Sequence, residues 1–256
     1  MKSEPSKDNN GKKNVMRIIP NLFTLFNGLT GVWALYYVFT GNTLFASFLI
    51  LSAAGFDGMD GYFARKLNVE NSYGALYDSI CDSISFVIAP SMMMLLFISD
   101  SGLKSKYIEY ISLLVMSMLL FAGIARLTKY TIKASKLKYF EGIPTPFVAE
   151  SVALFIFLNN FIYIEQYKLF IIVIIPILSI MMVSPLKYTK SSYSKRVLYL
   201  SFMIGLFTIL PIVLKLVNRF FNFNFYYIEL FFAGISLVLL FVYLIGLPLN
   251  DWLDLI

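Results

Sequence analysis

The chain has 256 residues, of which 59% are hydrophobic and 14% are charged, and its mean hydropathy is +0.75. These values are far more apolar than those of soluble domains, and they predict a membrane protein with several spanning helices. Because the chain has no histidine and a single cysteine, the sequence excludes serine–histidine triads, cysteine–histidine nucleophiles, histidine-ligated zinc and intrachain disulfides, which leaves carboxylate, amine, hydroxyl and hard-metal chemistry.

The first 19 residues are polar, carry five basic side chains and contain no apolar core followed by a cleavage site. We expect residues 1–19 to be a cytosolic tail, in part a short helix on the bilayer surface, rather than a signal peptide. Eight apolar stretches follow, and a spanning helix needs about 20 residues. They lie at 20–40, 43–64, 74–98, 107–127, 146–164, 168–186, 197–216 and 226–247. We expect one membrane domain over 20–248 and a short cytosolic tail over 249–256.

Basic residues gather in alternate loops. Sixteen lie in the N-terminal tail and in the segments 65–73, 126–145 and 187–196, against five in the other loops. Since basic loops stay in the cytosol during insertion, both termini are predicted to be cytosolic. The fold class is therefore an all-α polytopic bundle of about eight transmembrane helices in the cytoplasmic membrane. The net charge of +6 is attributed to anionic lipid rather than to nucleic acid, and a soluble bundle is disfavoured because runs such as 169–182 have no polar face.

Four acidic residues lie within one stretch of 26 residues, near the expected cytosolic ends of the second and third spans: Asp57, Asp60, Asp78 and Asp82. A carboxylate deep in a span costs roughly 2.5–3.5 kcal/mol even on a lenient insertion scale, so the cluster indicates a functional site facing the cytosol. Positions three or four apart share one helix face, which pairs Asp57 with Asp60 and Asp78 with Asp82. If the segment 65–73 is a short turn, the two spans are antiparallel and the four carboxylates converge.

Converging carboxylates suit hard divalent cations such as Mg²⁺, and two cations would balance four negative charges. We therefore expect two divalent ions as cofactors. A cation-coupled transporter is the alternative from another class of protein. It is disfavoured because transporters place such sites near mid-membrane in two repeats, whereas all four acids lie in one stretch near one membrane face.

Small residues accompany the acids, namely Gly55, Gly58, Gly61, Ala64 and Gly74. They indicate either close helix packing or space for a bulky ligand, and the sequence leaves both interpretations open. Cys81 lies on a different helix face from the neighbouring acids, so we expect it to have a packing role.

The stretch reads Asp57-x2-Asp60-Gly61-x2-Ala64-Arg65-x8-Gly74-x3-Asp78-x3-Asp82. It resembles, at every fixed position, the signature of the membrane CDP-alcohol phosphotransferases, and the resemblance in motif and flanks covers roughly residues 18–150. It implies transfer of a phosphatidyl group from a CDP-activated lipid to an alcohol, with release of CMP. It also implies a homodimer.

The resemblance further implies a role for each matching residue. Asp57, Asp60 and Asp78 would ligate the metal ions, Mg²⁺ or Mn²⁺ with Ca²⁺ as an option. Asp82 would be the general base and also a candidate ligand. The residues implied to bind the nucleotide or the CDP-lipid are Asn21, Thr24, Asp60, Gly61, Ala64, Arg65, Gly74 and Asp78. For Pro20 and Asn21, a simple helix start is the alternative.

Three flanking segments, 19–27, 78–90 and 140–146, resemble the phosphatidylserine synthases of that family. They imply L-serine as the acceptor and CDP-diacylglycerol, or CDP-archaeol in an archaeal host, as the donor. Glycerol 3-phosphate or inositol phosphate is the alternative acceptor, because several lysines lie between 126 and 138.

A serine site needs a fixed cation for the carboxylate, and Arg126 at the cytosolic end of the fourth span is the candidate. The alternative is an arginine whose guanidinium extends to the membrane interface. Glu150 is a weaker candidate to orient a basic group or the serine ammonium.

Overall fold

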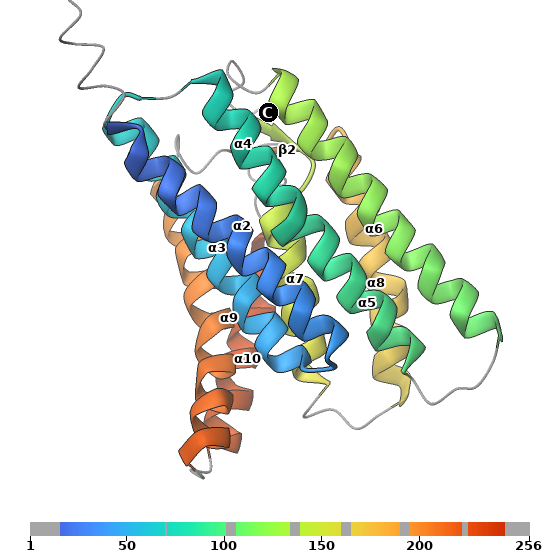
Figure 1. Cartoon of the computed structure of the whole chain (residues 1–256). Coiled ribbons are helices and arrows are strands. Elements are labelled where there is room, and N and C mark those ends of the chain that lie inside the picture. The colour runs from blue at the N-terminus through green and yellow to red at the C-terminus, as the bar shows by residue number, and fades with distance from the viewer. Residues whose placement is uncertain are drawn as a thin grey trace, which may run out of the picture.

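The computed structural model describes residues 16–69, 71–100, 106–133, 139–159, 165–189, 195–221 and 225–243. These residues form a bundle of long helices with one small two-stranded sheet at one end (Figure 1). The elements are α2 (Ile18–Phe39), α3 (Thr43–Lys66), α4 (Ser72–Asp82), η1 (Ser83–Ile88), α5 (Ala89–Ser99), α6 (Lys106–Lys133), β1 (Tyr139–Glu141), α7 (Thr145–Leu158), α8 (Glu165–Val183), β2 (Lys187–Thr189), α9 (Lys195–Phe221) and α10 (Tyr226–Phe241).

Each of the eight predicted spans has a helix in its place. Four helical rods are long and apolar enough to cross a membrane, and they are Ile18–Phe39, Thr43–Lys66, Tyr73–Ser99 and Lys106–Thr131. Three further apolar helices are shorter, namely Thr145–Leu158, Tyr167–Val183 and Tyr226–Leu240. A helical membrane protein is therefore confirmed, while the number of eight spans stays a prediction. Most of the predicted N-terminal tail, and all of the tail over 249–256, lie outside the described residues.

Helix α7 is the centre of the bundle. Twelve of its 14 residues are buried, and it touches α3, α5, α8, α9 and α10. At about 1.5 Å per residue it is shorter than a bilayer core of about 30 Å. A helix that is apolar on every side is stable in lipid or inside a core of other helices, and the burial of α7 shows that other helices surround it. The predicted span 146–164 is thus a buried core helix as far as Leu158.

The helical rod Tyr73–Ser99, which consists of α4, η1 and α5, contains a π-helical segment that was not expected from the sequence. Residues Ser83–Ile88 form η1 directly after the last aspartate of α4. Glycines let two helices approach this segment closely: a Cβ added at Gly31 of α2 would lie 2.4 Å from Ser85 Oγ, and one at Gly123 of α6 would lie 2.6 Å from Val87 Cγ1. A π-turn rotates the residues that follow it relative to those before it. The segment therefore separates the acidic face of α4 from the apolar packing of α5.

Two short strands modify the all-α prediction. Strand β1 pairs antiparallel with β2, with Glu141 opposite Lys187. Gly142 then turns the chain with a φ of 78°, and its N–H donates to the Leu186 carbonyl over 2.7 Å. A side chain at this glycine would collide with the Met182 carbonyl, 2.0 Å away. Glycine is required here, because the chain must adopt a positive φ while it enters α7 against the end of α8.

Candidate active site

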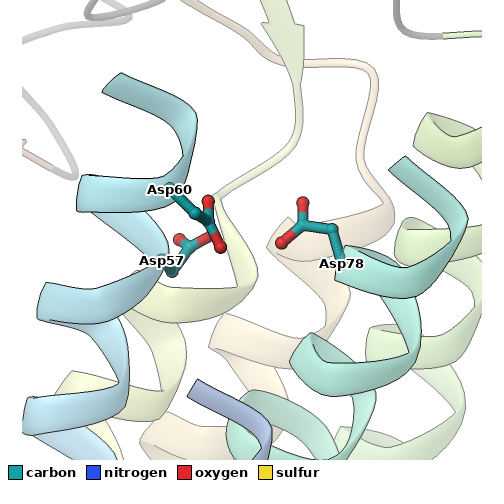
Figure 2. Close-up of side chains that lie close together, drawn as sticks. All are labelled: Asp57, Asp60 and Asp78. Atoms are coloured by element: carbon teal, nitrogen blue, oxygen red, sulfur yellow. The ribbon is translucent and has the colours of Figure 1, made fainter. Parts of the chain in front are cut away.

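Three aspartates converge at one end of the bundle. Figure 2 shows Asp57 and Asp60 on α3 pointing toward Asp78 on α4. One carboxylate oxygen from each of the three lies within 4.8 Å of the others. The short connection between α3 and α4 brings the two helices to the same end of the bundle, where α2 packs against both of them.

Helix α2 supplies the polar partners of these carboxylates. Thr24 Oγ1 donates a hydrogen bond of 2.8 Å to Asp60 Oδ2. One turn further, Asn27 Nδ2 donates a hydrogen bond of 2.8 Å to Asp82 Oδ1, and its own backbone carbonyl accepts from Ser85 Oγ of η1 at 2.8 Å. Thr24 was a predicted site residue, whereas Asn27 was missed. The sequence feature that could have identified Asn27 is a polar residue one turn after Thr24, on the same face of an apolar helix.

The fourth aspartate is arranged differently from the other three. Asp82 is buried and does not belong to the group of three close carboxylates, although it lies within electrostatic reach of Asp57 and Asp78. The expectation that four carboxylates meet at one point is therefore only partly right. One helical turn, about 5.4 Å along the axis, separates Asp82 from Asp78, and this gives the two acids different surroundings.

The three-aspartate group fits a divalent metal ion. Its donors are carboxylate oxygens, which hard cations prefer. Asp78 Oδ1 is buried and has no hydrogen-bond partner among the described residues. Buried polar atoms normally have a partner, so this oxygen is available to a ligand.

A polar cleft of about 550 Å³ opens at the first turns of α4, next to Asp78 in the chain, and it is lined by Arg17, Asn21, Asn71, Tyr73, Gly74 and Tyr77. Two of these, Asn21 and Gly74, were predicted from sequence to contact the nucleotide. Asn71 caps α4, with its Oδ1 accepting from the Gly74 N–H over 2.6 Å. A Cβ at Gly74 would lie 3.3 Å from the same oxygen. The cap and the small residue together leave the start of α4 open toward the cleft.

The remaining predicted nucleotide residues lie on the last turns of α3. Arg65 folds back over Gly61, so that a Cβ at Gly61 would lie 3.2 Å from an Arg65 guanidinium nitrogen. Ala64 is half-buried on the same turns. At Gly55 and Gly58, no described atom outside the local helix lies within 4 Å of an added Cβ. These two glycines do not pack against another helix of the described chain, which favours the interpretation of open space.

Cys81 packs against helix α2, as predicted. It is buried, and a Cβ at Gly28 of α2 would lie 2.8 Å from its Sγ. The close approach of α2 at this point brings Thr24 and Asn27 to the acids.

Arg126 is directed into the bundle rather than out to the membrane interface. It is 6% exposed, and an Nη donates to Thr145 Oγ1 over 3.2 Å. The guanidinium carbon lies 4.7 Å from the centre of the Tyr130 ring, and the charge lies within reach of Asp82 and Asp57. An arginine extending to the interface would be exposed, so that alternative is wrong. Tyr130 and Thr145 were not predicted individually, although Thr145 belongs to the segment 140–146.

Glu150 also faces this region. It is half-buried on α7 and lies within electrostatic reach of Asp57. Of the lysines expected near the site, Lys129 forms an ion pair of 2.5 Å with Glu141. Lys136 and Lys138 lie outside the described residues.

Comparison with known proteins agrees with this arrangement. Residues 17–184 match the family model described as CDP-alcohol phosphatidyltransferase. The match extends beyond the segment of about 18–150 that carried the resemblance in sequence, and it reaches the end of α8.

Several relatives carry names that describe related activities. A CDP-diacylglycerol–serine O-phosphatidyltransferase of Helicobacter pylori is 29% identical over 205 residues, which cover 78% of this chain and 84% of the relative. An archaetidylserine synthase of Methanothermobacter thermautotrophicus is 29% identical over 174 residues, covering 67% and 70%. A CDP-diacylglycerol–serine O-phosphatidyltransferase of Bacillus subtilis is 30% identical over 145 residues, covering 57% and 78%. Since the family model matches well over half of the chain, the chain belongs to the CDP-alcohol phosphatidyltransferase family.

Proposed function

We propose that this protein transfers the phosphatidyl or archaetidyl group of a CDP-activated lipid to the hydroxyl of L-serine and releases CMP. The observation that carries the proposal is the convergence of Asp57, Asp60 and Asp78, with a polar cleft at the first turns of α4 and the buried cation Arg126 within electrostatic reach of Asp57. This arrangement offers separate places for a metal-bound diphosphate and for a carboxylate-bearing acceptor. The names of the three relatives support serine as that acceptor.

Asp57, Asp60 and Asp78 are the residues that would hold two divalent ions, Mg²⁺ or Mn²⁺ with Ca²⁺ as an option. When bound, such ions neutralise charge on the diphosphate and on the leaving CMP. Thr24 keeps the Asp60 carboxylate in place through its hydrogen bond. The cleft residues Asn21 and Gly74, with Gly61, Ala64 and Arg65 on α3, would bind the nucleotide part of the donor.

Asp82 is assigned as the general base. The serine hydroxyl oxygen forms a bond to the β-phosphorus, the bond from that phosphorus to the bridging oxygen breaks, and the electron pair leaves with CMP. The hydroxyl proton passes to Asp82. Asn27 binds one oxygen of this carboxylate, which leaves the other oxygen to accept the proton. The position of Asp82 outside the close group favours a base over a shared ligand.

Arg126 would bind the serine carboxylate, since a guanidinium pairs with a carboxylate through two parallel hydrogen bonds. Glu150 is the candidate for the serine ammonium. The proposal includes a membrane domain over 20–248 with eight spans and cytosolic termini, a catalytic end that faces the cytosol from the cytoplasmic membrane, and a homodimer. Membership of a transferase family argues against the cation-coupled transporter.

The test is CMP release by the purified protein with CDP-lipid and one acceptor at a time: L-serine, glycerol 3-phosphate, inositol phosphate or inositol. We expect turnover with L-serine to exceed that with each other acceptor. Preference for a phosphorylated acceptor would reject serine and favour the alternative, because a guanidinium also binds phosphate. Serine transport without CMP formation would contradict the enzyme itself.

A further inference from the structure

Two of the contacts that hold Arg126 are made by Tyr130 and Thr145. Arg126 and Tyr130 are one turn apart on α6, and the guanidinium lies 4.7 Å from the centre of the tyrosine ring. The guanidinium also donates to Thr145 Oγ1 at the start of α7. A ring face and a hydroxyl thus contact the same buried cation, and a contact between a cation and a ring is stronger when both are removed from water.

The hydroxyl of Tyr130 contacts the backbone of strand β1. It donates to the Glu141 carbonyl over 3.0 Å and accepts from the Glu141 N–H. Glu141 is the last residue of β1. Since Gly142 pairs with Leu186, and hydrogen-bonded and non-bonded pairs alternate along an antiparallel ladder, the N–H and carbonyl of Glu141 point away from β2. The tyrosine hydroxyl therefore occupies the free edge of β1.

The segment that follows Glu141 leads to Thr145, the residue that accepts the hydrogen bond from Arg126. After the glycine turn at Gly142, Ile143 donates its N–H to the Met181 carbonyl over 3.2 Å, and Pro144 precedes Thr145. The turn fixes the path of this segment against α8, and Thr145 is fully buried where α7 begins. Each link between Tyr130 and Thr145 is thus either a hydrogen bond or a conformationally restricted turn.

We propose that Tyr130 is a positioning residue for the acceptor site, which holds the Arg126 guanidinium with its ring and the Thr145 hydroxyl through Glu141. This inference rests on the proposed function, in which Arg126 binds the acceptor anion. Tyr130 does not touch the reacting phosphorus or the metal-binding aspartates in this scheme. Loss of the tyrosine should therefore weaken acceptor binding and leave binding of the CDP-lipid unchanged.

The experiment compares Tyr130→Phe and Tyr130→Leu with wild type in steady-state CMP release, varying L-serine and CDP-lipid separately. Tyr130→Phe keeps the ring and removes both hydrogen bonds, so we expect a rise in KM for L-serine of a few-fold. Tyr130→Leu also removes the ring, and we expect a rise on the order of tenfold, as 1.4 kcal/mol of lost binding gives. For both variants, KM for CDP-lipid and kcat should stay within about twofold of wild type.

The matched control is Tyr110→Phe, an exposed tyrosine on the same helix, for which all constants should equal those of wild type. A variant that fails to fold is recognised by its thermal unfolding, and Tyr130→Phe, which changes one oxygen atom, then carries the test. Ethanolamine, which lacks the carboxylate, provides a second readout: the preference for L-serine over ethanolamine should fall in the order wild type, Tyr130→Phe, Tyr130→Leu.

Equal loss of affinity for both substrates, or a fall in kcat with KM for L-serine unchanged, would overturn the positioning role. The outcome is separable from that of the proposed function. If wild type prefers a phosphorylated acceptor, serine is rejected, and the same KM rise is then expected for that acceptor, because Arg126 would bind its phosphate. An unchanged KM for the preferred acceptor in Tyr130→Leu would contradict the inference whichever acceptor is used.

Discussion

At the scale of single residues, two aspartates one turn apart have different surroundings. Asp78 belongs to the close group of three carboxylates and has a buried oxygen with no partner among the described residues. Asp82 lies outside that group, and Asn27 binds it. The two residues have the same chemistry, so their different roles in the proposal follow from their neighbours.

This difference predicts opposite behaviour in a metal-binding measurement. Asp78→Asn and Asp82→Asn should each lower CMP release by at least about 10²-fold. A ligand that binds only the folded state raises thermal stability, so Mn²⁺ should raise the Tm of wild type and of Asp82→Asn. It should leave the Tm of Asp78→Asn almost unchanged. Loss of the Mn²⁺ effect in Asp82→Asn would make Asp82 a ligand rather than the base.

At the scale of elements, the site depends on how closely α2 approaches the rod of α4 and η1. Gly28 and Gly31 leave no room for a side chain against Cys81 and Ser85. This contact brings the polar face of α2 within hydrogen-bond distance of the acids. Helix packing therefore sets the geometry of the acids.

We predict that Gly31→Ala destabilises the protein, because the added Cβ would lie 2.4 Å from Ser85 Oγ and 2.8 Å from Ser85 Cα. Overpacking of this kind costs about 1–3 kcal/mol, which thermal unfolding in detergent measures as a lower Tm. Gly55→Ala is the matched control, since that position is open within the described chain, and its Tm should equal or slightly exceed that of wild type. An equal Tm for the two variants would show that α2 does not pack as described.

At the scale of the whole molecule, the catalytic end and the opposite end lie on different sides of the expected membrane. Helices α4 and α6 begin at opposite ends of the bundle (Figure 1). The second residue of each is strongly exposed, Tyr73 at 85% and Tyr107 at 78%. The single native cysteine, Cys81, is buried and gives little labelling background.

Labelling of intact cells with a membrane-impermeant maleimide should therefore modify Tyr107→Cys and leave Tyr73→Cys unmodified until the cells are opened. The expectation follows from the concentration of basic residues in the loops at the catalytic end. The wild-type chain is the background control. Modification of Tyr73→Cys in intact cells would reverse the proposed orientation and place the acids outside the cytosol.

The positions of the helices and the pairing of the acidic residues could be predicted from the sequence alone. Apolar stretches fix the positions of helices because burial of a helix in lipid needs only a local run of apolar residues, and each expected span has a helix in its place. The spacing of Asp57, Asp60 and Asp78 fixes a shared helix face for the first two and their convergence with the third across a short turn. The shared face is a consequence of local helix geometry, whereas the final positions of the three carboxylates also depend on α2, which packs against both helices.

Only the tertiary structure decided how each helix is rotated about its own axis and what its polar residues meet. It separates Asp82 from the other acids, turns Arg126 inward onto Tyr130 and Thr145, and inserts a π-helical segment after α4. The physical reason is that these contacts join residues far apart in the chain, as Asn27 and Asp82 are. Periodicity along a single helix defines its faces, whereas the neighbour that meets each face is set by packing of the whole bundle.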